Sequence, residues 1–279
     1  MKTVSIGLVM LLLCAACGQR KEAKVLDSEV VVADSLAADS LAADSASMAG
    51  ISDKVDETFD DFVYTYASDV RFQLHRTRFP LPYTEDGAQT AIPRGQWVHD
   101  ALYSNQEYYN MLFESEDDLE YEKDMKVGTV YVDWLYLDKQ KIRRYHFGRV
   151  KGHWMLQDIR EESLAGNPNE GFLQFFYHFC NDSVYQREHI KSPLKFVTTD
   201  PDDDFKVMEA FISVDQWFVF RPILPGDKMT NIDYGQPYSK AASQKIVTIR
   251  DIGNGYNNML FFSRHGNSWK LSAFEDLSN

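Results

Sequence analysis

A repeat within the chain constrains its fold more than any other feature of the sequence. Residues 59–81 (FDDFVYTYASDVRFQLHRTRFPL) align without a gap with residues 172–194 (FLQFFYHFCNDSVYQREHIKSPL), at an offset of 113 positions. A second block, FGRVKGHWML (147–156), aligns with FSRHGNSWKL (262–271) at an offset of 115. Because the two offsets nearly agree, both blocks belong to one duplicated unit.

The repeat divides the folded part of the chain into two modules, 53–165 and 169–279, joined at 166–169. Each module opens with an amphipathic helix, because apolar residues recur on one helical face. In the first copy these are Phe59, Phe62, Val63, Tyr66 and Ala67; in the second they are Phe172, Phe175, Phe176, Phe179 and Cys180.

The later part of each module has the pattern and tight turns of antiparallel strands. Strands are predicted at 127–138, 141–150, 153–159, 216–224, 244–252, 257–264 and 268–274, and a short helix at 205–211. A helix followed by long strands predicts an α+β fold. We expect two tandem cone-shaped modules, each a long N-terminal helix packed on a curved antiparallel sheet.

The N-terminus has the pattern of a lipoprotein signal peptide. A short apolar run, 4–13, is too short to span a bilayer, and Ala15-Ala16-Cys17 follows it. This ending resembles a bacterial lipobox, which implies lipidation of Cys17 after cleavage; Cys14 stands where an aliphatic residue is usual. The alternative is an ordinary secretory signal with a chance cysteine.

Residues 18–52 contain near-repeats of ADSLA and are predicted to be a disordered acidic tether. The formal net charge of −13 argues against nucleic acid as a partner, because phosphate binding needs a basic surface. Cys180 would be the only free thiol of the processed chain, so no internal disulfide is expected. Its place on the apolar helix face favours a buried, inert thiol over a catalytic one.

The helix, short helical middle and curved sheet resemble the nuclear transport factor 2-like fold, also called cystatin-like. The tandem arrangement, the lipobox and the Q-x-x-R-x-x-F-P-L segment (Gln73 to Leu81) resemble an uncharacterised Bacteroidetes lipoprotein family. This resemblance covers 53–279, although the second copy has His189 in place of Arg76 and Ser192 in place of Phe79. Modules of this fold commonly pair through their sheets, which implies an intrachain pseudo-dimer.

Polar residues at matched positions are the candidates for a binding site. The candidate pocket-lining residues are Gln73, Arg76, Arg149, Gln186, His189 and Arg264. The alternative is that these side chains make structural or surface bonds. The matched pair Asp69 and Asp182 is expected to bond turn amides.

No catalytic or cofactor-binding signature is found in the sequence, and no metal motif with its usual spacing. The acidic run at 200–204 begins like a calcium loop, but Phe205 and Phe211 stand where glycine and glutamate are needed. We therefore expect Asp202, Asp203 and Asp204 at the start of a helix. Residues 114–122 are expected to form a solvated acidic face.

These observations predict a lipid-anchored cell-envelope protein that is not an enzyme and that binds a small ligand, a glycan fragment or a partner protein. The alternatives are a structural or assembly scaffold, and an isomerase- or hydrolase-like enzyme that uses a cone pocket. The residues after Cys17 (Gly18, Gln19, Arg20) favour the periplasmic face of the outer membrane.

Overall fold

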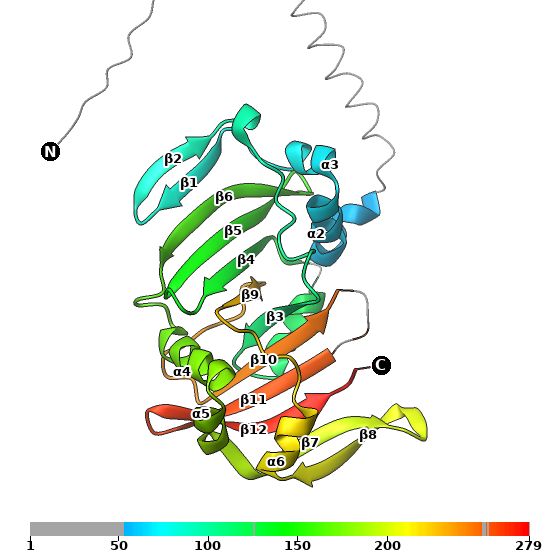
Figure 1. The fold of residues 1–279 in the computed structure, drawn as a ribbon. Coiled ribbons are helices and arrows are strands. Elements are labelled where there is room, and N and C mark those ends of the chain that lie inside the picture. Colours follow the sequence, from blue (N-terminus) through cyan, green and yellow to red (C-terminus); the bar gives the residue numbers. More distant parts are fainter. Residues whose placement is uncertain (1–52, 125, 253–254, 256, 279) are drawn as a thin grey trace, which may run out of the picture. The chain divides into compact units, whose positions relative to one another are not determined.

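Two six-stranded sheets, each with helices against one face, make up the part of the chain that the structure describes (Figure 1). The computed structural model describes residues 53–124, 126–252, 255 and 257–278. The predicted signal peptide (1–17), with Cys17, and the predicted tether (18–52) lie outside the described residues.

Both segments of the repeat contain two α-helices followed by six strands; the first adds three 3-10 helices, and the second adds a third α-helix after its second strand. The first has η1 (Asp53–Asp56), α2 (Phe59–Ser68), α3 (Val70–His75), β1 (Leu81–Glu85), β2 (Ala88–Ile92), η2 (Arg94–Gln96), β3 (Tyr108–Phe113), η3 (Asp117–Lys123), β4 (Thr129–Tyr136), β5 (Lys141–Val150) and β6 (His153–Ser163). The second has α4 (Glu170–Asn181), α5 (Ser183–Glu188), β7 (Ile190–Asp200), β8 (Asp203–Ile212), α6 (Val214–Phe220), β9 (Lys228–Asp233), β10 (Gln244–Asp251), β11 (Asn257–His265) and β12 (Ser268–Asp276).

The predicted α+β fold class is confirmed, with one addition. Most strand pairs are antiparallel, but β1 pairs in parallel with β6, and β7 pairs in parallel with β12. Each sheet is therefore mixed. The matched peptide bonds before Pro80 and Pro193 are both cis.

Side-chain caps begin the short helices at matched positions. The Asp69 carboxylate accepts hydrogen bonds from Arg71 N (2.8 Å) and Phe72 N (2.9 Å) at the start of α3. Asp182 does the same for Val184 N (2.8 Å) and Tyr185 N (3.1 Å) at the start of α5. These bonds satisfy helix amides that have no partner within the helix, as expected from the sequence.

Aromatic side chains join each long helix to its sheet. All five predicted apolar residues of α2 are buried, and the Phe147 ring of β5 lies 5.2–5.8 Å from Phe59, Phe62 and Tyr66. In the second module the Phe262 ring of β11 lies 5.2–5.7 Å from four phenylalanines of α4. The repeated sequence thus builds the same aromatic core twice.

The two modules exchange one strand. The first sheet has the order β2-β1-β6-β5-β4-β9, and the second has the order β8-β7-β12-β11-β10-β3. In chain order β3 precedes β4 as β9 precedes β10, so each of these strands occupies the other's place. The predicted boundary at 166–169 lies between β6 and α4. The two sheets do not divide at this boundary, because β3 belongs to the second sheet and β9 belongs to the first.

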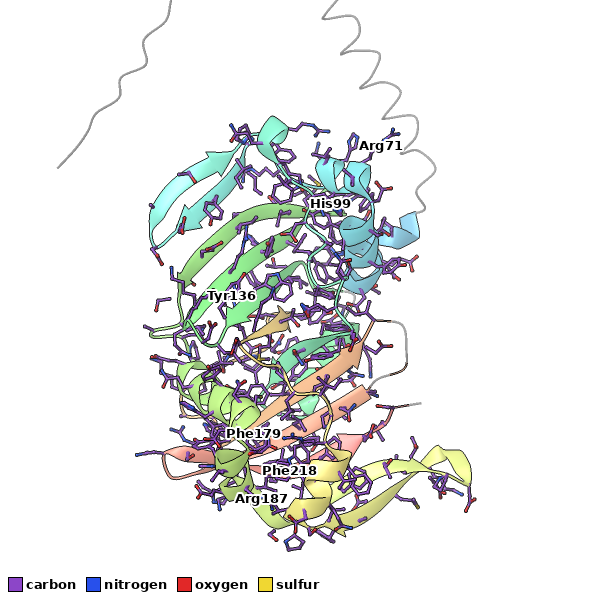
Figure 2. The ribbon with its side chains drawn as sticks, viewed as in Figure 1. Arg71, His99, Tyr136, Phe179, Arg187 and Phe218 are labelled. Carbon is purple, nitrogen blue, oxygen red and sulfur yellow. The ribbon has the colours of Figure 1, made fainter. Side chains whose placement is uncertain are left out.

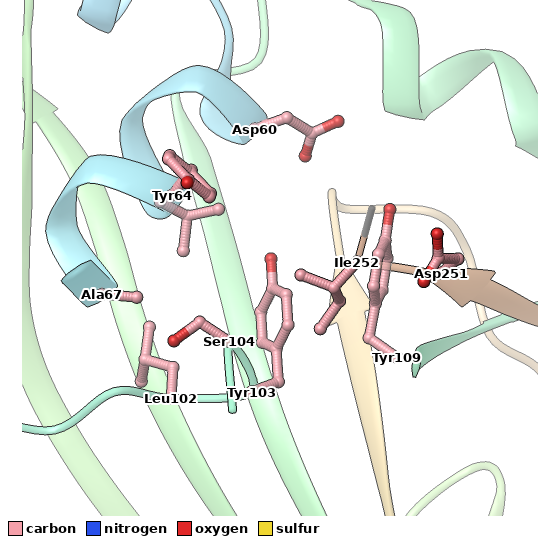
Figure 3. Close-up of a pocket in the computed structure, with 10 residues that line it drawn as sticks. Asp60, Tyr64, Ala67, Leu102, Tyr103, Ser104, Tyr109, Asp251 and Ile252 are labelled. Carbon is pink, nitrogen blue, oxygen red and sulfur yellow. The ribbon is translucent and has the colours of Figure 1, made fainter. Parts of the chain in front are cut away.

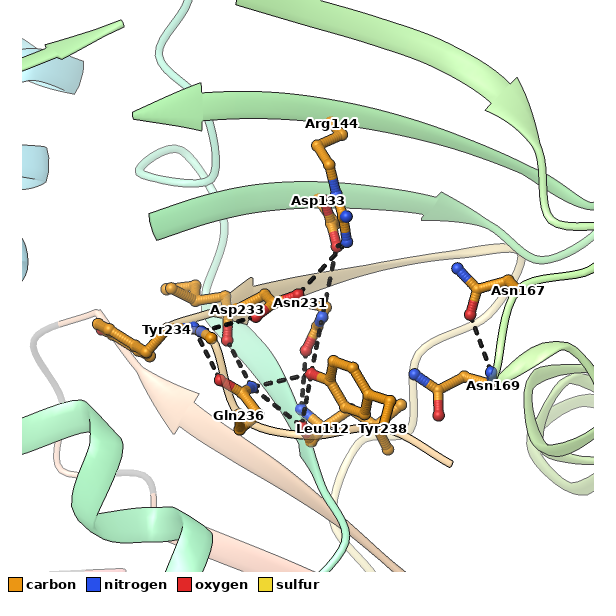
Figure 4. Close-up of polar contacts among 12 residues, drawn as sticks. Leu112, Asp133, Arg144, Asn167, Asn169, Asn231, Asp233, Tyr234, Gln236 and Tyr238 are labelled. Carbon is orange, nitrogen blue, oxygen red and sulfur yellow. Dashed lines mark hydrogen bonds and ion pairs between the residues drawn. The ribbon is translucent and has the colours of Figure 1, made fainter. Parts of the chain in front are cut away.

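Buried polar side chains fill the seam where β3 passes β9 (Figure 4). Thr230 Oγ1 accepts from Asn110 N (2.7 Å), and Asn231 Oδ1 accepts from Leu112 N (2.8 Å). Tyr238 donates its hydroxyl to Leu112 O (2.9 Å). The free backbone edge of β3 is thereby satisfied by side chains, which fixes the register of the exchanged strands.

Two acids share one arginine beside this seam. Arg144 makes a two-pronged ion pair with Asp133 (2.8 Å at each oxygen) and lies 3.4 Å from Asp233 Oδ2. Burial, with the nearby Asp133 charge, raises the pKa of Asp233 from 3.8 to about 6. The folded chain therefore holds this proton more tightly than the unfolded chain does.

This shift predicts a pH dependence of stability. The contribution of Asp233 is fully present below pH 4 and is lost as the pH rises through about 6. We expect Asp233→Asn to raise the free energy of unfolding more at pH 7.5 than at pH 4.5, by at most about 3 kcal/mol. Urea titrations at the two pH values measure this difference, and an equal effect at both would contradict it.

For two segments the predicted type of secondary structure, helix or strand, is wrong. Residues 205–211 belong to strand β8 and not to a helix, because β8 pairs along its length with β7 in a hairpin. Residues 216–224 are not a strand; helix α6 begins at Val214. Ser213 and Gln216 form a reciprocal capping box, in which each side chain accepts from the other's backbone amide (3.2 and 2.8 Å).

Two acidic runs also differ from expectation. Asp200 and Asp202 lie at the hairpin turn between β7 and β8, where Asp200 Oδ1 accepts from Asp202 N (2.9 Å), so no helix begins there. Residues 114–122 are only partly solvated. Glu114 contacts the buried Lys245 amine (2.5 Å), Asp118 is buried, and Glu122 lies 3.5 Å from Arg250.

Candidate functional site

The first sheet presents a polar and aromatic surface on the face that α2 covers at one end. Directly opposed residues of neighbouring strands share a face of a sheet. Trp134 lies opposite Arg143, and Arg143 lies opposite Glu161. Tyr145 and Tyr83 both lie opposite Ile159, one on each side of it. These side chains therefore belong to a single surface.

A cleft of about 610 Å³ lies between this surface and the segment that follows β2. Its lining residues are Ile92, Gln96, Trp97, Val98, His99, Asp100, Ala101, Leu102, Asn105 and Arg143. Figure 2 shows where His99 and Tyr136 lie on this module. A cleft of this volume is within the usual range for small-molecule sites.

Gln73 holds the segment over the sheet. Its side-chain oxygen accepts from Trp97 Nε1 (3.0 Å) and from Asp100 N (2.9 Å). Its side-chain nitrogen donates to Tyr66 O (2.9 Å) and Asp100 O (2.8 Å). One buried amide thus joins helix α2 to the wall of the cleft.

The carboxylates of the cleft are already engaged. Asp100 accepts from Tyr145 OH (2.5 Å) and from Leu102 N (2.8 Å). Glu161 lies 3.2 Å from Arg143 Nε. Burial, helped by the Glu161 carboxylate, raises the pKa of Tyr83 to about 12; burial and the Asp100 charge raise the pKa of Tyr145. Both phenols stay protonated at neutral pH and can donate hydrogen bonds.

Two buried nitrogen atoms of the cleft have no hydrogen-bond partner in the described part of the chain. They are His99 Nε2 and Arg143 Nε, whose ion pair with Glu161 is not a well-directed hydrogen bond. Buried polar atoms without partners are uncommon and are often found where a ligand binds. These two can bond an oxygen atom supplied by a ligand.

The exchanged strand adds a cation to the same surface. Lys228 of β9 places its amine 3.4 Å from the centroid of the Trp134 ring. Partial burial lowers the pKa of Lys228. The second module therefore contributes one side chain to the site of the first.

The corresponding surface of the second module is more apolar, although Asn258 and Asp276 stand at the positions of Arg143 and Glu161. Strand register matches Tyr83 with Phe196, Tyr145 with Leu260 and Ile159 with Phe274. The Phe196 ring stacks between Phe220 (5.8 Å) and Phe274 (5.3 Å). Helix α6 thus packs its aromatic residues where the first module has a cleft.

Comparison with known proteins identifies the family of the chain. Residues 38–276 match the model described as a domain of unknown function, DUF4348. The chain belongs to this family. The DUF4348 chain is also similar to a crystal structure of a nuclear transport factor 2-like protein from Bacteroides fragilis, with 45% identity and a TM-score of 0.77. That match covers 81% of this chain, more than either module alone, and 98% of the other chain.

The predicted nuclear transport factor 2-like fold of this DUF4348 chain is therefore confirmed. No curated protein has a significant match to it. No helix among the described residues is both long enough and apolar enough to cross a bilayer.

The six residues predicted from matched positions bond other parts of the fold. Gln186 repeats the role of Gln73, because it donates to Phe179 O (2.6 Å) and accepts from Trp217 Nε1 (3.1 Å). Arg76 pairs with Asp56 (2.8 Å), while His189 Nδ1 contacts Tyr185 O (2.7 Å).

Arg149 and Arg264 also have matched surroundings. Their guanidinium carbons lie 4.4 Å and 5.7 Å from the ring centroids of Trp154 and Trp269. Arg149 donates to Asp56 O (2.6 Å), and Arg264 donates to Lys240 O (2.7 Å). None of the six lines the cleft of the first module.

Within the described residues, no three His, Cys, Asp or Glu side chains are grouped so that they could hold a metal ion. Cys180 borders a cavity of about 390 Å³ beside Phe218 and Arg221. Burial raises the pKa of the Cys180 thiol, which keeps it protonated and poorly nucleophilic.

The matched positions of the two copies do not include the cleft, because the residues of the cleft and its sheet surface do not recur. Tyr83, Arg143 and Tyr145 correspond to Phe196, Asn258 and Leu260. A tyrosine in the first copy aligned with an apolar residue in the second, as at Tyr83 and Tyr145, was a detectable signal in the sequence. The difference between the copies marks the candidate site, whereas the identities mark shared structure.

Proposed function

We propose that the first module binds a small organic acid, such as a sugar acid, in the cleft between segment 92–105 and Arg143. The observation that carries this proposal is the difference between the modules. One sheet surface is polar, aromatic and open to a 610 Å³ cleft, and its counterpart is packed with aromatic side chains.

The polar nitrogen atoms of the cleft favour an acidic ligand. Asp100 accepts two hydrogen bonds and Glu161 is ion-paired with Arg143, whereas His99 Nε2 has no partner among the described residues and Arg143 Nε makes no well-directed hydrogen bond there. Lys228 adds a second cation near the same surface. A ligand carboxylate supplies the missing acceptor, and bonds between arginine and carboxylate are among the stronger ones in proteins.

The aromatic residues in and beside the cleft favour a ligand that contains a ring. Trp97 borders the cleft, and Trp134 lies beside Arg143 on the neighbouring strand. Aromatic faces pack against apolar ring faces, while the amide of Asn105 can bond hydroxyl groups.

The five tryptophans of the chain provide the test. Indole N–H signals of the ¹⁵N-labelled full chain are followed during titration with glucuronate and, separately, with glucose. We expect glucuronate to shift the Trp97 and Trp134 signals saturably, to leave Trp217 and Trp269 unchanged, and to bind more tightly than glucose.

Arg143→Leu should weaken glucuronate binding at least about tenfold, because a charge-assisted bond is lost. Arg160→Leu is the matched control, since Arg160 lies on the neighbouring strand opposite Arg144 and so on the other face. Absence of saturable shifts, shifts confined to Trp217 and Trp269, or an unaffected Arg143→Leu variant would each contradict the proposal.

An isomerase- or hydrolase-like reaction in the same cleft is the second candidate. The observation in its favour is the carboxylate–phenol pair of Asp100 and Tyr145, held 2.5 Å apart. Binding is preferred because both Asp100 oxygens already accept hydrogen bonds. Appearance of product signals during the titration would favour the enzyme.

We also propose that Cys17 carries a lipid that holds the chain at the periplasmic face of the outer membrane. The support is the Ala15-Ala16-Cys17 ending after a short apolar run, and the similarity to a Bacteroides protein. Cys17→Ser should move the chain from the membrane fraction to the soluble fraction. Efficient release by protease added to intact cells would contradict the periplasmic placement.

A further inference from the structure

A second pocket lies where the first module meets the second. Its volume is about 150 Å³, and it is bordered by α2, by the segment before β3, and by the ends of β3 and β10 (Figure 3). It exists because β3 is paired with β10 in the second sheet. Leu102 borders both this pocket and the cleft proposed above, and the other lining residues differ.

Polar groups without partners point into this pocket. The residue Tyr103 is only 8% exposed, and no hydrogen bond is found for its hydroxyl or for that of Tyr109 among the described residues. Asp60 Oδ1 accepts from Tyr234 OH (2.8 Å), which leaves Oδ2 available. Figure 3 shows the Asp60 carboxylate and the Tyr103 hydroxyl directed toward the same space.

The charge around the pocket is negative. Asp60 and Asp251 border it, and Glu122 lies close enough to interact with Asp60. The cation Arg250 lies 3.5 Å from Glu122 and donates to Asn257 (3.0 Å). The acids are not grouped to hold a metal ion in the described part of the chain, so the complementary ligand is an organic cation.

The remainder of the pocket suits an alkyl chain. Val63, Ala67 and Leu102 are buried residues that line it. The Tyr103 and Tyr109 rings lie with centroids 5.1 Å apart and 36° between their planes. Aromatic faces attract ammonium groups, and apolar walls accept the attached methylene groups.

We propose that this junction pocket binds a primary alkylammonium group, with Asp60 and the Tyr103 hydroxyl as partners of the ammonium. The ligand is either a free amine or a lysine side chain of another protein, because both present the same chemistry. Partial burial raises the pKa of Asp60 against the opposing bond from Tyr234, and a bound cation would favour its charged form.

The test is an NMR titration of the full chain with n-butylammonium, followed through backbone amides of α2 and β3. We expect saturable shifts at these amides, and no saturable shifts with 1-butanol, which has the same alkyl chain without the charge. Asp60→Asn should weaken binding at least about tenfold, because a charge-assisted bond is lost.

Two further variants keep the result interpretable. Tyr103→Phe removes only a hydroxyl that has no internal partner, so it should fold normally and weaken binding about threefold or more. Asp61→Asn makes the same charge change one residue away, outside the pocket lining, and should alter binding less than about twofold. Unchanged thermal midpoints show that the variants are folded.

A second titrant distinguishes a lysine side chain of a partner protein from a free amine. Binding of Nα-acetyl-lysine amide that depends on Asp60 supports a lysine of a partner protein, and binding of n-butylammonium alone supports a free amine. No saturable binding of n-butylammonium, equal binding of 1-butanol, or insensitivity to both Asp60→Asn and Tyr103→Phe would overturn the proposal.

Discussion

Replacing Arg144 with methionine should destabilise the chain by about 3–5 kcal/mol. Arg144 is the ion-pair partner of Asp133, whose side chain is 1% exposed, and it also lies near Asp233. Methionine fills most of the same space but leaves a buried carboxylate without its cation. The free energy of unfolding at pH 7.5, measured by urea denaturation, checks this expectation.

The control lies on the same strand. Lys141 pairs with Asp86 at 3.0 Å, but both side chains are substantially exposed. Lys141→Met should therefore change stability by less than about 1 kcal/mol. Equal effects of the two substitutions would show that the acids beside the exchanged strand are not buried as described.

Truncating Phe262 to alanine should cost about 3–5 kcal/mol. Its ring is fully buried at the centre of four phenylalanines of α4, so truncation leaves a cavity that rigid neighbours cannot fill. Because the modules share strands, the loss should also weaken the first module. Amide hydrogen exchange should therefore accelerate in β5 as well as in β11, by a similar factor for the slowest amides.

Phe211→Ala is the matched control for this substitution. Phe211 is 71% exposed on β8, and its truncation should change stability by less than about 0.5 kcal/mol. If Phe262→Ala accelerated exchange in β11 and left β5 unchanged, the two modules would be energetically independent. That result would contradict their interlocking through β3 and β9.

The sequence was sufficient to predict the long helix and three of the six strands in each module, but not β1, β2, β3, β7, β8 or β9. The strands 141–150 and 244–252 are found within one residue of their predicted ends. Residues 205–211 and 216–224 were predicted in the wrong type for identifiable reasons. Met208, Glu209 and Ala210 have helical preferences that the β7–β8 hairpin overrides, and the Ser213–Gln216 capping box starts a helix in a segment rich in strand-forming residues.

Strand exchange could not be predicted from the sequence. The pattern of β3 suits either sheet edge, since a strand pairs with any neighbour that meets its backbone and its face. The choice depends on long-range polar contacts such as those from Asn231 and Tyr238 to Leu112. No local pattern contains that information.

Both candidate sites depend on this exchange. Lys228 lies over Trp134, on the sheet surface that also presents Arg143, because β9 extends the first sheet. Tyr109 and Asp251 border the junction pocket together because β3 pairs with β10. Duplication alone would give two similar modules, whereas exchange gives one module access to side chains of the other.

The most direct test is to measure contacts between backbone protons by NMR. We expect contacts between β4 and β9, for example Asp133 with Asn231, and between β10 and β3, for example Thr248 with Met111. Contacts instead between β3 and β4, and between β9 and β10, would mean that each module keeps its own strand. That result would contradict the interlocked fold and both sites built on it.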